Sequence, residues 1–250
     1  MQHCAVRSNG FAPTGMPRIA IVAAMEREVE PLIRGWESRW VEHDGRKFKV
    51  FQKGETALVC GGIGPDAARR ATEAMIRTHQ PDQILSAGFA GGLDPVLRVG
   101  DVIEPSSVVN ARDGSRIGTD QGAGILVTST EIATAAHKRK LRDLYAANAV
   151  DMEAAAVAQG AEVRGLKFGA LKVVSDEADW SLPPVEGFVS RDGSFRTAAF
   201  AFHVALRPWL WSSTIALARN SRKAGNALSS ALAKYLDDIA ADQPGAAGEK

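Results

Sequence analysis

The sequence predicts an α/β fold on two observations. Short apolar runs rich in β-branched residues recur along the chain, beginning at 18–24, and such runs are typical of strands buried on both faces. Stretches with the apolar spacing of a helix, such as 66–78, lie between them. Strands that alternate with helices predict a sheet covered by helices. With 250 residues the chain can form one large core, a simpler organisation than two small domains.

The first half of the chain supplies four of these elements before its glycine-rich turn. The apolar run at 18–24 predicts a strand, and the residues at 28–34 have a helical pattern. Two strands at 47–52 and 56–60, separated by a Gly-containing turn, predict a hairpin. The turn then leads into the helix at 66–78, where alanines occupy one face and charged residues the other.

The second half continues the alternation. Apolar runs predict further strands at 83–86, 102–109, 125–128 and 166–174. Helices are predicted at 130–147 and 153–163. The second of these is rich in alanine, a strong helix former whose small side chain allows close packing on a sheet.

We divide the chain into a flexible leader at 1–17, a single catalytic domain at 18–238 and a disordered tail at 239–250. The leader is polar and irregular, and the tail is small and polar. Within the domain, 195–217 is unusually aromatic and aliphatic. Arg207 and Pro208 in its middle argue against a continuous membrane span. Two interpretations stay open: two core helices, or a greasy pocket or membrane-surface patch for a large apolar substrate.

Composition excludes several classes of function. The formal net charge is +1, so the excess of positive charge that nucleic-acid binding needs is missing. The two cysteines and five histidines show no metal-ligand spacing, and we expect no metal site. The start of the chain lacks the charged-then-apolar order of a secretory signal. We therefore expect a cytoplasmic protein.

Carboxylates stand where three of the apolar runs end. The first run is followed by Glu26 and Glu28, another by Asp151 and Glu153, and the last by Asp176. In an open α/β sheet, ligands bind at the edge formed by the carboxyl ends of the strands. Acids from distant segments would therefore converge on one substrate there, as in an active site.

Glycine turns offer a competing interpretation. Residues 62–67 follow a strand, open a helix and match a dinucleotide-binding pattern of the GxGxxA type. In that motif an acid closes the second strand, but Asp82 lies before that strand. The turns either serve only chain geometry or bring backbone amides close to a ligand, and we favour the second alternative.

Five blocks in order together resemble the nucleoside phosphorylase superfamily, most closely its methylthioadenosine/S-adenosylhomocysteine nucleosidases. They are IVAAMERE at 21–28, GIG at 62–64, SAGFAGGL at 86–93, VDMEA at 150–154 and SDEAD at 175–179. Beyond residue 179, the WSLPP turn at 180–184 and the segment 188–222 are similar to the bacterial hopanoid-associated phosphorylases. The resemblance implies a three-layer fold with a central mixed sheet, and removal of adenine from adenosylhopane.

The resemblance also implies roles for the acids. Asp176 would supply a proton near purine N7, so that adenine leaves as a neutral molecule, and Ser175 would position the acid or base. Burial after an apolar run would let Asp176 hold that proton near neutral pH. Glu153 would accept hydrogen bonds from the ribose hydroxyls. Met152 would lie against the sugar or base, or simply belong to the core, and Glu28 would activate water, or lie on the surface.

The nucleophile, water or phosphate, stays open because the sequence departs from the family around it. Lys172 replaces a cleft arginine of the nucleosidases, and Phe89 replaces a serine of their glycine turn, beside Ala90 and Gly91. Lys172 could bind phosphate as a point charge, help to hold Glu28 and water, or be an ordinary strand lysine. The stretch from 109 to 150 is also short for the nucleosidases, which would leave the 5′ side of the site open.

We therefore predict an enzyme without metal or organic cofactor, with phosphate as a co-substrate only if the nucleophile is not water. It would break the N-glycosidic bond of an adenine nucleoside, with adenosylhopane of hopanoid biosynthesis as the preferred substrate. The alternatives are a methylthioadenosine/S-adenosylhomocysteine nucleosidase and a non-catalytic nucleoside-binding module. The resemblance implies a homo-oligomer, and the apolar segment raises the prospect of peripheral membrane contact.

Overall fold

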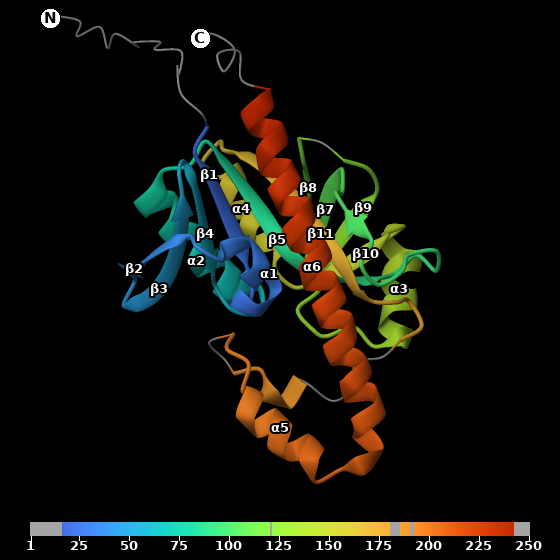
Figure 1. Cartoon of the computed structure of the whole chain (residues 1–250). Helices are drawn as coiled ribbons and strands as arrows, with labels where there is room; N and C mark the ends of the chain where they lie inside the picture. Colours follow the sequence, from blue (N-terminus) through green and yellow to red (C-terminus); the bar gives the residue numbers. More distant parts are fainter. Residues whose placement is uncertain (1–16, 121, 181–185, 191–192, 243–250) are drawn as a thin grey trace, which may run out of the picture.

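A mixed sheet runs through the centre of the protein, and helices cover both of its faces (Figure 1). The computed structural model describes residues 17–120, 122–180, 186–190 and 193–242. The strands are β1 (Ile19–Ala23), β2 (Glu37–His43), β3 (Arg46–Lys53), β4 (Thr56–Cys60), β5 (Gln83–Gly92), β6 (Val102–Ile103), β7 (Ser107–Asn110), β8 (Arg116–Gly118), β9 (Ile125–Thr128), β10 (Ala149–Asp151) and β11 (Lys167–Asp176). The helices are α1 (Glu26–Ile33), α2 (Pro65–His79), α3 (Ala135–Tyr145), α4 (Ala154–Glu162), α5 (Thr197–Ala205) and α6 (Trp211–Ala241), with short 3-10 turns η1 (Glu186–Phe188) and η2 (Pro208–Leu210).

Strand β5 is the centre of the sheet. The strand order is β2-β3-β4-β1-β5-β10-β9-β7-β8, and β11 pairs with β5 and with β6 off this path. β1 and β11 run parallel to β5, whereas β10 runs antiparallel to it near its carboxyl end. The predicted mixed sheet is therefore confirmed, and β5 is the strand that all three acid-bearing segments adjoin.

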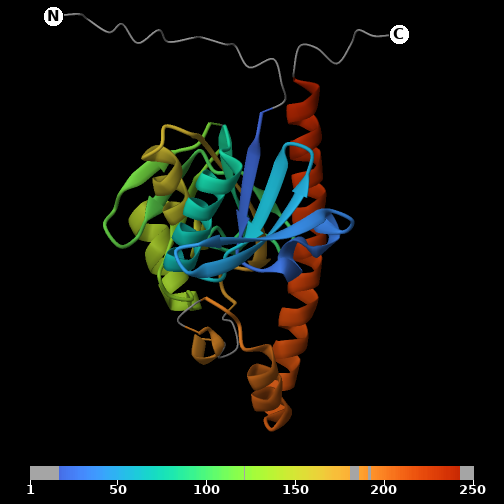
Figure 2. The same ribbon diagram turned by 90° about the vertical axis from the view of Figure 1, so that its left-hand side faces the viewer.

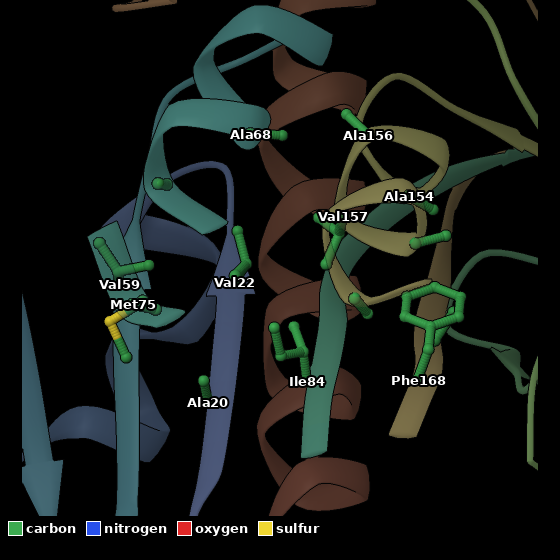
Figure 3. Packing of buried hydrophobic residues seen from close by; sticks show 14 of the residues in the cluster. Ala20, Val22, Val59, Ala68, Met75, Ile84, Ala154, Ala156, Val157 and Phe168 are labelled. Atoms are coloured by element: carbon green, nitrogen blue, oxygen red, sulfur yellow. The ribbon is translucent and has the colours of Figure 1, made fainter. Parts of the chain in front are cut away.

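Two apolar layers hold the helices to the sheet, which confirms the predicted three-layer fold. On one face, α2 and α4 pack on the strands, and Ala68, Ala154 and Val157 of these helices belong to one buried cluster with Ile84 and Phe168 of the sheet (Figure 3). On the other face, α1 and α6 cover the same strands through a second buried cluster. The alanines of α4 are almost all buried, so this helix approaches the sheet closely, as its composition predicted.

Several predicted elements needed correction. The segment predicted as one strand at 102–109 forms β6 and β7, because Glu104-Pro105 interrupts it and proline cannot donate to a ladder. The helix predicted from 130 begins at Ala135, after Thr134, whose side chain caps it by accepting a hydrogen bond from the backbone N–H of His137. β2, β8 and β10 were not predicted. β2 has an almost entirely exposed, polar sequence, and β8 and β10 have only three residues each, so none of them leaves a clear apolar pattern.

The aromatic segment after η1 does not form two core helices. In α5 only Phe200 is buried, and the buried residues of α6 begin at Ala224. α5 and the first turns of α6 project beyond the sheet (Figures 1 and 2). α6 continues to Ala241, past the predicted domain boundary at 238. The predicted leader and the remainder of the predicted tail lie outside the described residues, apart from residue 17 and residue 242.

No helix in the described part of the chain is both long enough and apolar enough to cross a membrane.

Candidate active site

A cavity of about 810 Å³ lies at the carboxyl ends of the central strands. Its lining contains the three predicted catalytic carboxylates, Glu28, Glu153 and Asp176. It also contains five of the six residues predicted to bind substrate: Met152, Ser175, Phe89, Ala90 and Gly91. The sixth, Lys172, lies behind the wall. The acids that are far apart in the sequence therefore do converge on one cavity.

The register of β5 explains the convergence. Val22, near the end of β1, pairs with Ser86 of β5. Further along β5, Gly91 pairs both with Val150 of β10 and with Asp176 of β11. Because these three strands end beside the same stretch of β5, the acids that follow them share one space.

Two glycines of β5 make room for the charged groups. A side chain at Gly88 would meet Glu28 Oε2 at 3.1 Å and Lys172 Nζ at 3.8 Å, and the φ of Gly88 is +149°. A side chain at Gly91 would meet Asp176 Oδ2 at 3.0 Å and the Lys138 Cε at 3.1 Å. These glycines of β5 thus allow the side chains of functional residues to approach the strand closely.

Glu28 is buried at the floor of the cavity, which excludes the surface alternative. It is 3% exposed, and its Oε2 has no hydrogen-bond partner among the residues that the structure describes. Burial, reinforced by the neighbouring Glu153, raises the pKa of Glu28 to about 8, although Lys172 opposes the shift. A buried carboxylate oxygen without a partner is costly, so this atom is placed to receive a donor from a ligand or water.

Lys172 is neither a free cation nor an ordinary strand lysine. It is 1% exposed, and its Nζ lies 2.9 Å from Oδ2 of Asp151, a buried acid whose role the sequence pattern did not reveal. Burial by itself would lower the pKa of Lys172, but Asp151, Glu153 and Glu28 outweigh that effect and raise it. One ammonium therefore faces three carboxylates. It is buried and already paired with Asp151.

Glu153 begins α4 and is held by backbone donors. Its Oε1 accepts a hydrogen bond of 2.8 Å from the N–H of Gly64, and its Oε2 accepts one of 3.3 Å from the N–H of Met152. Burial, together with the charge of Asp151, raises the pKa of Glu153 to about 7. The turn at 62–64 thus contributes an amide that holds a side chain of the site; the predicted approach of these amides to a ligand stays a prediction.

A β-bulge between Val174 and Asp176 turns the end of β11 toward the cavity. Ser175 Oγ donates a hydrogen bond of 2.6 Å to Oδ1 of Asp176, and the backbone O of Ala90 lies 3.4 Å from the same hydroxyl. Asp176 is 4% exposed. The bulge explains how two consecutive residues of one strand can both line the cavity.

Lys138 is a site residue that the sequence pattern did not reveal. It projects from the first turns of α3, is 1% exposed and forms an ion pair with Oδ2 of Asp176. Its other donors reach the backbone O of Glu177 at 2.6 Å and of Trp180 at 3.2 Å. A lysine in a charged helix usually faces solvent, which is why sequence gave no signal. The sequence predicted that Asp176 is buried after an apolar run, and it is buried, but together with its counter-ion Lys138.

Part of the cavity wall is apolar and comes from the projecting segment. Phe195 and Phe200 line it, and their ring centroids lie 5.6 Å apart in an edge-to-face arrangement. From α6, Thr214, Leu217 and Ala218 complete the wall. The guanidinium of Arg27 lies over the ring of Phe195, 5.1 Å from its centroid. The cavity thus has a charged end on the sheet and an apolar end on α5 and α6.

Comparison with known proteins gives this arrangement a family. The family model of the phosphorylase superfamily matches residues 18–131 and 124–201. The chain belongs to the phosphorylase superfamily. It is 28% identical over 200 residues to the 5′-methylthioadenosine/S-adenosylhomocysteine nucleosidase of Glaesserella parasuis, covering 65% of this chain and 86% of the relative. It is 30% identical over 202 residues to the nucleosidase of the same name from Bacillus cytotoxicus, covering 64% and 86%.

Solved structures show the same fold. Futalosine hydrolase of Helicobacter pylori superposes with a TM-score of 0.68 at 18% identity, covering 89% of this chain and 98% of the other. For the 5′-methylthioadenosine nucleosidase of Arabidopsis thaliana the TM-score is 0.69 at 20% identity, with 90% and 96% covered. The predicted superfamily, fold and enzyme class, a nucleoside phosphorylase or nucleosidase, agree with these superfamily relatives.

Within the described residues, no group of three or more His, Cys, Asp or Glu side chains is arranged to hold a metal ion.

Proposed function

We propose that this protein is a nucleosidase that breaks the N-glycosidic bond between adenine and ribose and releases adenine. The observation that carries the proposal is the unpartnered, buried Oε2 of Glu28, which faces the same cavity as Glu153 and Asp176. Each acid would have one role: Glu28 activates the nucleophile, Glu153 accepts hydrogen bonds from the sugar, and Asp176 serves the leaving purine. The named activities of the superfamily relatives support the same reaction class.

Glu28 is the general base in this mechanism. Water bound at Oε2 would give that oxygen the partner it lacks, and Glu28 would take the proton as the water oxygen bonds to C1′ of the ribose. A base works best when its pKa lies near the operating pH, and the pKa of Glu28 is raised to about 8. No metal or organic cofactor enters this step.

Glu153 is the sugar-binding residue. Each of its two oxygens accepts one hydrogen bond from a backbone N–H. The remaining lone pairs can accept hydrogen bonds from ribose hydroxyls. As the bond to adenine lengthens, the ribose gains positive charge, and a nearby carboxylate stabilises it. Met152 lines the cavity next to Glu153, in a position to contact the sugar or base.

Asp176 and Lys138 together serve the leaving group. When the C1′–N9 bond breaks, its electron pair enters the purine, and N7 must gain a proton for adenine to leave neutral. Asp176 is a carboxylate in its ion pair with Lys138, so the proton comes from the ammonium of Lys138: Asp176 accepts it at Oδ2 and passes it to N7, which leaves Lys138 as the neutral amine. Ser175 fixes the orientation of the carboxylate through Oδ1. The proton that Glu28 takes from water later returns to the pair through solvent, so the cycle balances.

Water is the nucleophile that the charges favour. A phosphate ion beside Glu28 would meet a cluster in which three carboxylates surround one ammonium, and that ammonium already pairs with Asp151. Like charges at such distances disfavour an anion. Phosphorolysis remains the alternative, and adding phosphate to the assay separates the two.

The apolar end of the cavity favours a substrate with a bulky apolar 5′ substituent, for which adenosylhopane of hopanoid biosynthesis is our preferred identity. The volume of about 810 Å³ lies in the upper part of the range of about 300–1,000 Å³ that is usual for small-molecule sites. Phe195, Phe200 and Leu217 offer a wall without charges of their own. The alternative substrate, a methylthioadenosine or S-adenosylhomocysteine molecule, would leave much of this wall uncovered.

We further propose a cytoplasmic homo-oligomer whose catalytic unit is residues 18–238, and which meets a membrane only peripherally. The near-neutral charge and the two widely separated cysteines support the first part. The projecting apolar segment supports the second.

The test is an assay of adenine release. Purified protein is incubated with 5′-methylthioadenosine, with inosine and with an adenosylhopane preparation, each with and without phosphate, and free base and sugar phosphate are measured. We expect adenine and free sugar without phosphate, and the fastest release from adenosylhopane. Sugar phosphate as the product would overturn the choice of water. Base release from none of the substrates would support a non-catalytic nucleoside-binding module instead.

A further inference from the structure

Five large apolar side chains are exposed together where α5, η2 and α6 meet. They are Phe202, Leu206, Trp209, Trp211 and Ile215, with 50% to 72% of each exposed. We call this set the aromatic tip. It lies at the end of the molecule that projects beyond the sheet (Figures 1 and 2). Single exposed apolar residues are ordinary, but a contiguous group of this size marks an interaction surface.

Helix geometry keeps the tip together. Phe202 and Leu206 are four residues apart at the end of α5, and Trp211 and Ile215 are four apart at the start of α6, so each pair shares one helical face. The indole N–H of Trp211 donates a hydrogen bond of 3.0 Å to the backbone O of Val204, which fastens the two helices to each other. The polar atom of this indole is thus satisfied, and its apolar ring is left for a partner.

The charged residues of the segment that carries the tip all have one sign. Between Gly193 and Leu236 the sequence contains no aspartate or glutamate, although the whole chain has 29 acidic residues against 30 basic ones. The basic residues in this stretch are Arg196, Arg207, Arg219, Arg222, Lys223 and Lys234. The segment therefore presents apolar and cationic side chains and would attract an anionic surface.

The apolar and cationic residues follow one another along α6 in the order that a membrane interface requires. Trp211, Ile215 and Arg219 lie four residues apart on one face, and Arg219 is exposed. At 1.5 Å per residue, Arg219 stands about 12 Å further along the helix than Trp211. Tryptophan is enriched at the membrane–water interface, and cations beside an apolar anchor are attracted to anionic headgroups.

We infer that the aromatic tip docks the enzyme on the surface of an anionic lipid bilayer. The same helix carries Thr214, Leu217 and Ala218, which line the apolar end of the cavity. The cavity's apolar end therefore opens beside the docked surface, where a lipid-linked nucleoside would enter. Only this delivery of substrate rests on the proposed function; the docking itself does not.

The test is sedimentation of the full chain with vesicles of phosphatidylcholine mixed with phosphatidylglycerol, and with vesicles of phosphatidylcholine alone. The tip variant combines Phe202→Ser, Trp209→Ser and Ile215→Ser, none of which lines the cavity. The matched control is Trp40→Ser, because Trp40 is 68% exposed on β2, away from the tip. We expect the tip variant to lose about tenfold or more of its binding to the anionic vesicles, and the control to lose none.

A charge variant and an oligomer measurement complete the test. Arg219→Glu should weaken binding to the anionic vesicles several-fold and leave the already weaker binding to phosphatidylcholine unchanged. No binding of the wild-type chain to anionic vesicles would overturn the inference. So would light scattering that shows the tip variant dissociating from an oligomer while its vesicle binding matches the wild type, since the tip would then be a contact between copies of this chain.

Folding and catalysis are controlled separately. Thermal unfolding should be alike in the wild type and the tip variant, since the three side chains are exposed. Adenine release from a water-soluble nucleoside should also be unchanged in that variant. If no protein releases adenine from any substrate, the proposed function fails while the sedimentation result still decides the docking.

Discussion

The two ends of the cavity are built in different ways. At the charged end, the groups stand on strands whose register with β5 fixes them, and each carboxylate has neighbours that are themselves buried. At the apolar end, Phe195, Phe200 and Leu217 belong to a segment that buries few side chains of its own. Substitutions on the sheet strands would disturb the buried core as well as the site. Substitutions on the projecting helices can alter the lining of the cavity without disturbing that core. The difference suggests that the chemistry is fixed by the sheet and the choice of 5′ substituent by α5 and α6.

Among substitutions at the charged end, we expect Asp176→Asn to have the largest effect on activity and stability. We expect the turnover number to fall about 10²- to 10⁴-fold, because the group that delivers the proton to N7 is lost. The substitution also leaves the buried ammonium of Lys138 without its counter-ion, which should reduce the free energy of unfolding by about 3–5 kcal/mol. Adenine release and chemical denaturation measure the two effects.

The double variant Asp176→Asn with Lys138→Met separates them. Removing both charges takes away the unpaired ammonium, so the free energy of unfolding should recover most of its loss while the turnover number stays low. Full turnover in Asp176→Asn would contradict the assignment of the leaving-group role. Recovery of turnover in the double variant would contradict it equally.

Glu28→Gln should remove activity and yet stabilise the fold at high pH. We expect the turnover number to fall about 10²- to 10³-fold, because glutamine cannot take a proton from water. The pKa of Glu28 rises from 4.5 to about 8 on folding, so the folded chain holds this proton more tightly than the unfolded chain. Wild-type stability therefore falls as pH rises from about 4.5 to 8, and the amide escapes that loss.

The measurement is thermal unfolding of both proteins across this pH range. The variant should match the wild type near pH 4.5 and exceed it by a few kcal/mol near pH 8. A variant that is inactive but no more stable than the wild type at pH 8 would show that burial does not raise the pKa of Glu28.

The pH dependence of catalysis tests whether the acids act as a cluster. Glu28 and Glu153 must both be ionised to take a proton from water and to stabilise the sugar, and their pKa values are raised to about 8 and about 7. The value of kcat/KM should therefore rise with pH through this range and level off above it, with a slope steeper than that of one group. Glu153→Gln should reduce the slope to that of a single group, and a profile flat from pH 6 to 9 would contradict both assignments.

The sequence predicted the charged end well because its signals are local. Glu28, Glu153 and Asp176 each follow an apolar run. The strands before Glu28 and Asp176 run parallel to β5, and parallel strands bring such positions to one edge of the sheet. Glu153 follows β10, which runs antiparallel to β5, and reaches the same place through the pairing of Val150 with Gly91. The resemblance to a known family supplied the same residues independently. Lys138 escaped notice, and Asp151 was noticed but given no role, because the importance of both lies in partners distant in the chain, namely Asp176 and Lys172.

The apolar end was predicted less well, and burial explains the difference. The composition of 195–217 is that of a core helix, and only the packing reveals that Phe200 is buried whereas Phe202 is 68% exposed. Two neighbouring phenylalanines on one short helix give the same sequence signal in either setting. The three-residue strand β10 was missed for a related reason, since its pairing with β5 and β9 determines it rather than its own pattern.

The smallest expected effect comes from the apolar end. Phe195→Ser shortens the wall and adds a polar group, so KM for an adenine nucleoside with a bulky apolar 5′ substituent should rise about tenfold. The turnover number should change little, because the side chain of Phe195 takes no part in the proton transfers. For 5′-methylthioadenosine both constants should stay near the wild-type values, since this substrate would leave much of the wall uncovered. Steady-state kinetics on the two substrates measure the contrast. A loss of turnover with both would show that the projecting helices organise the chemistry as well, and the separation of the two ends would no longer hold.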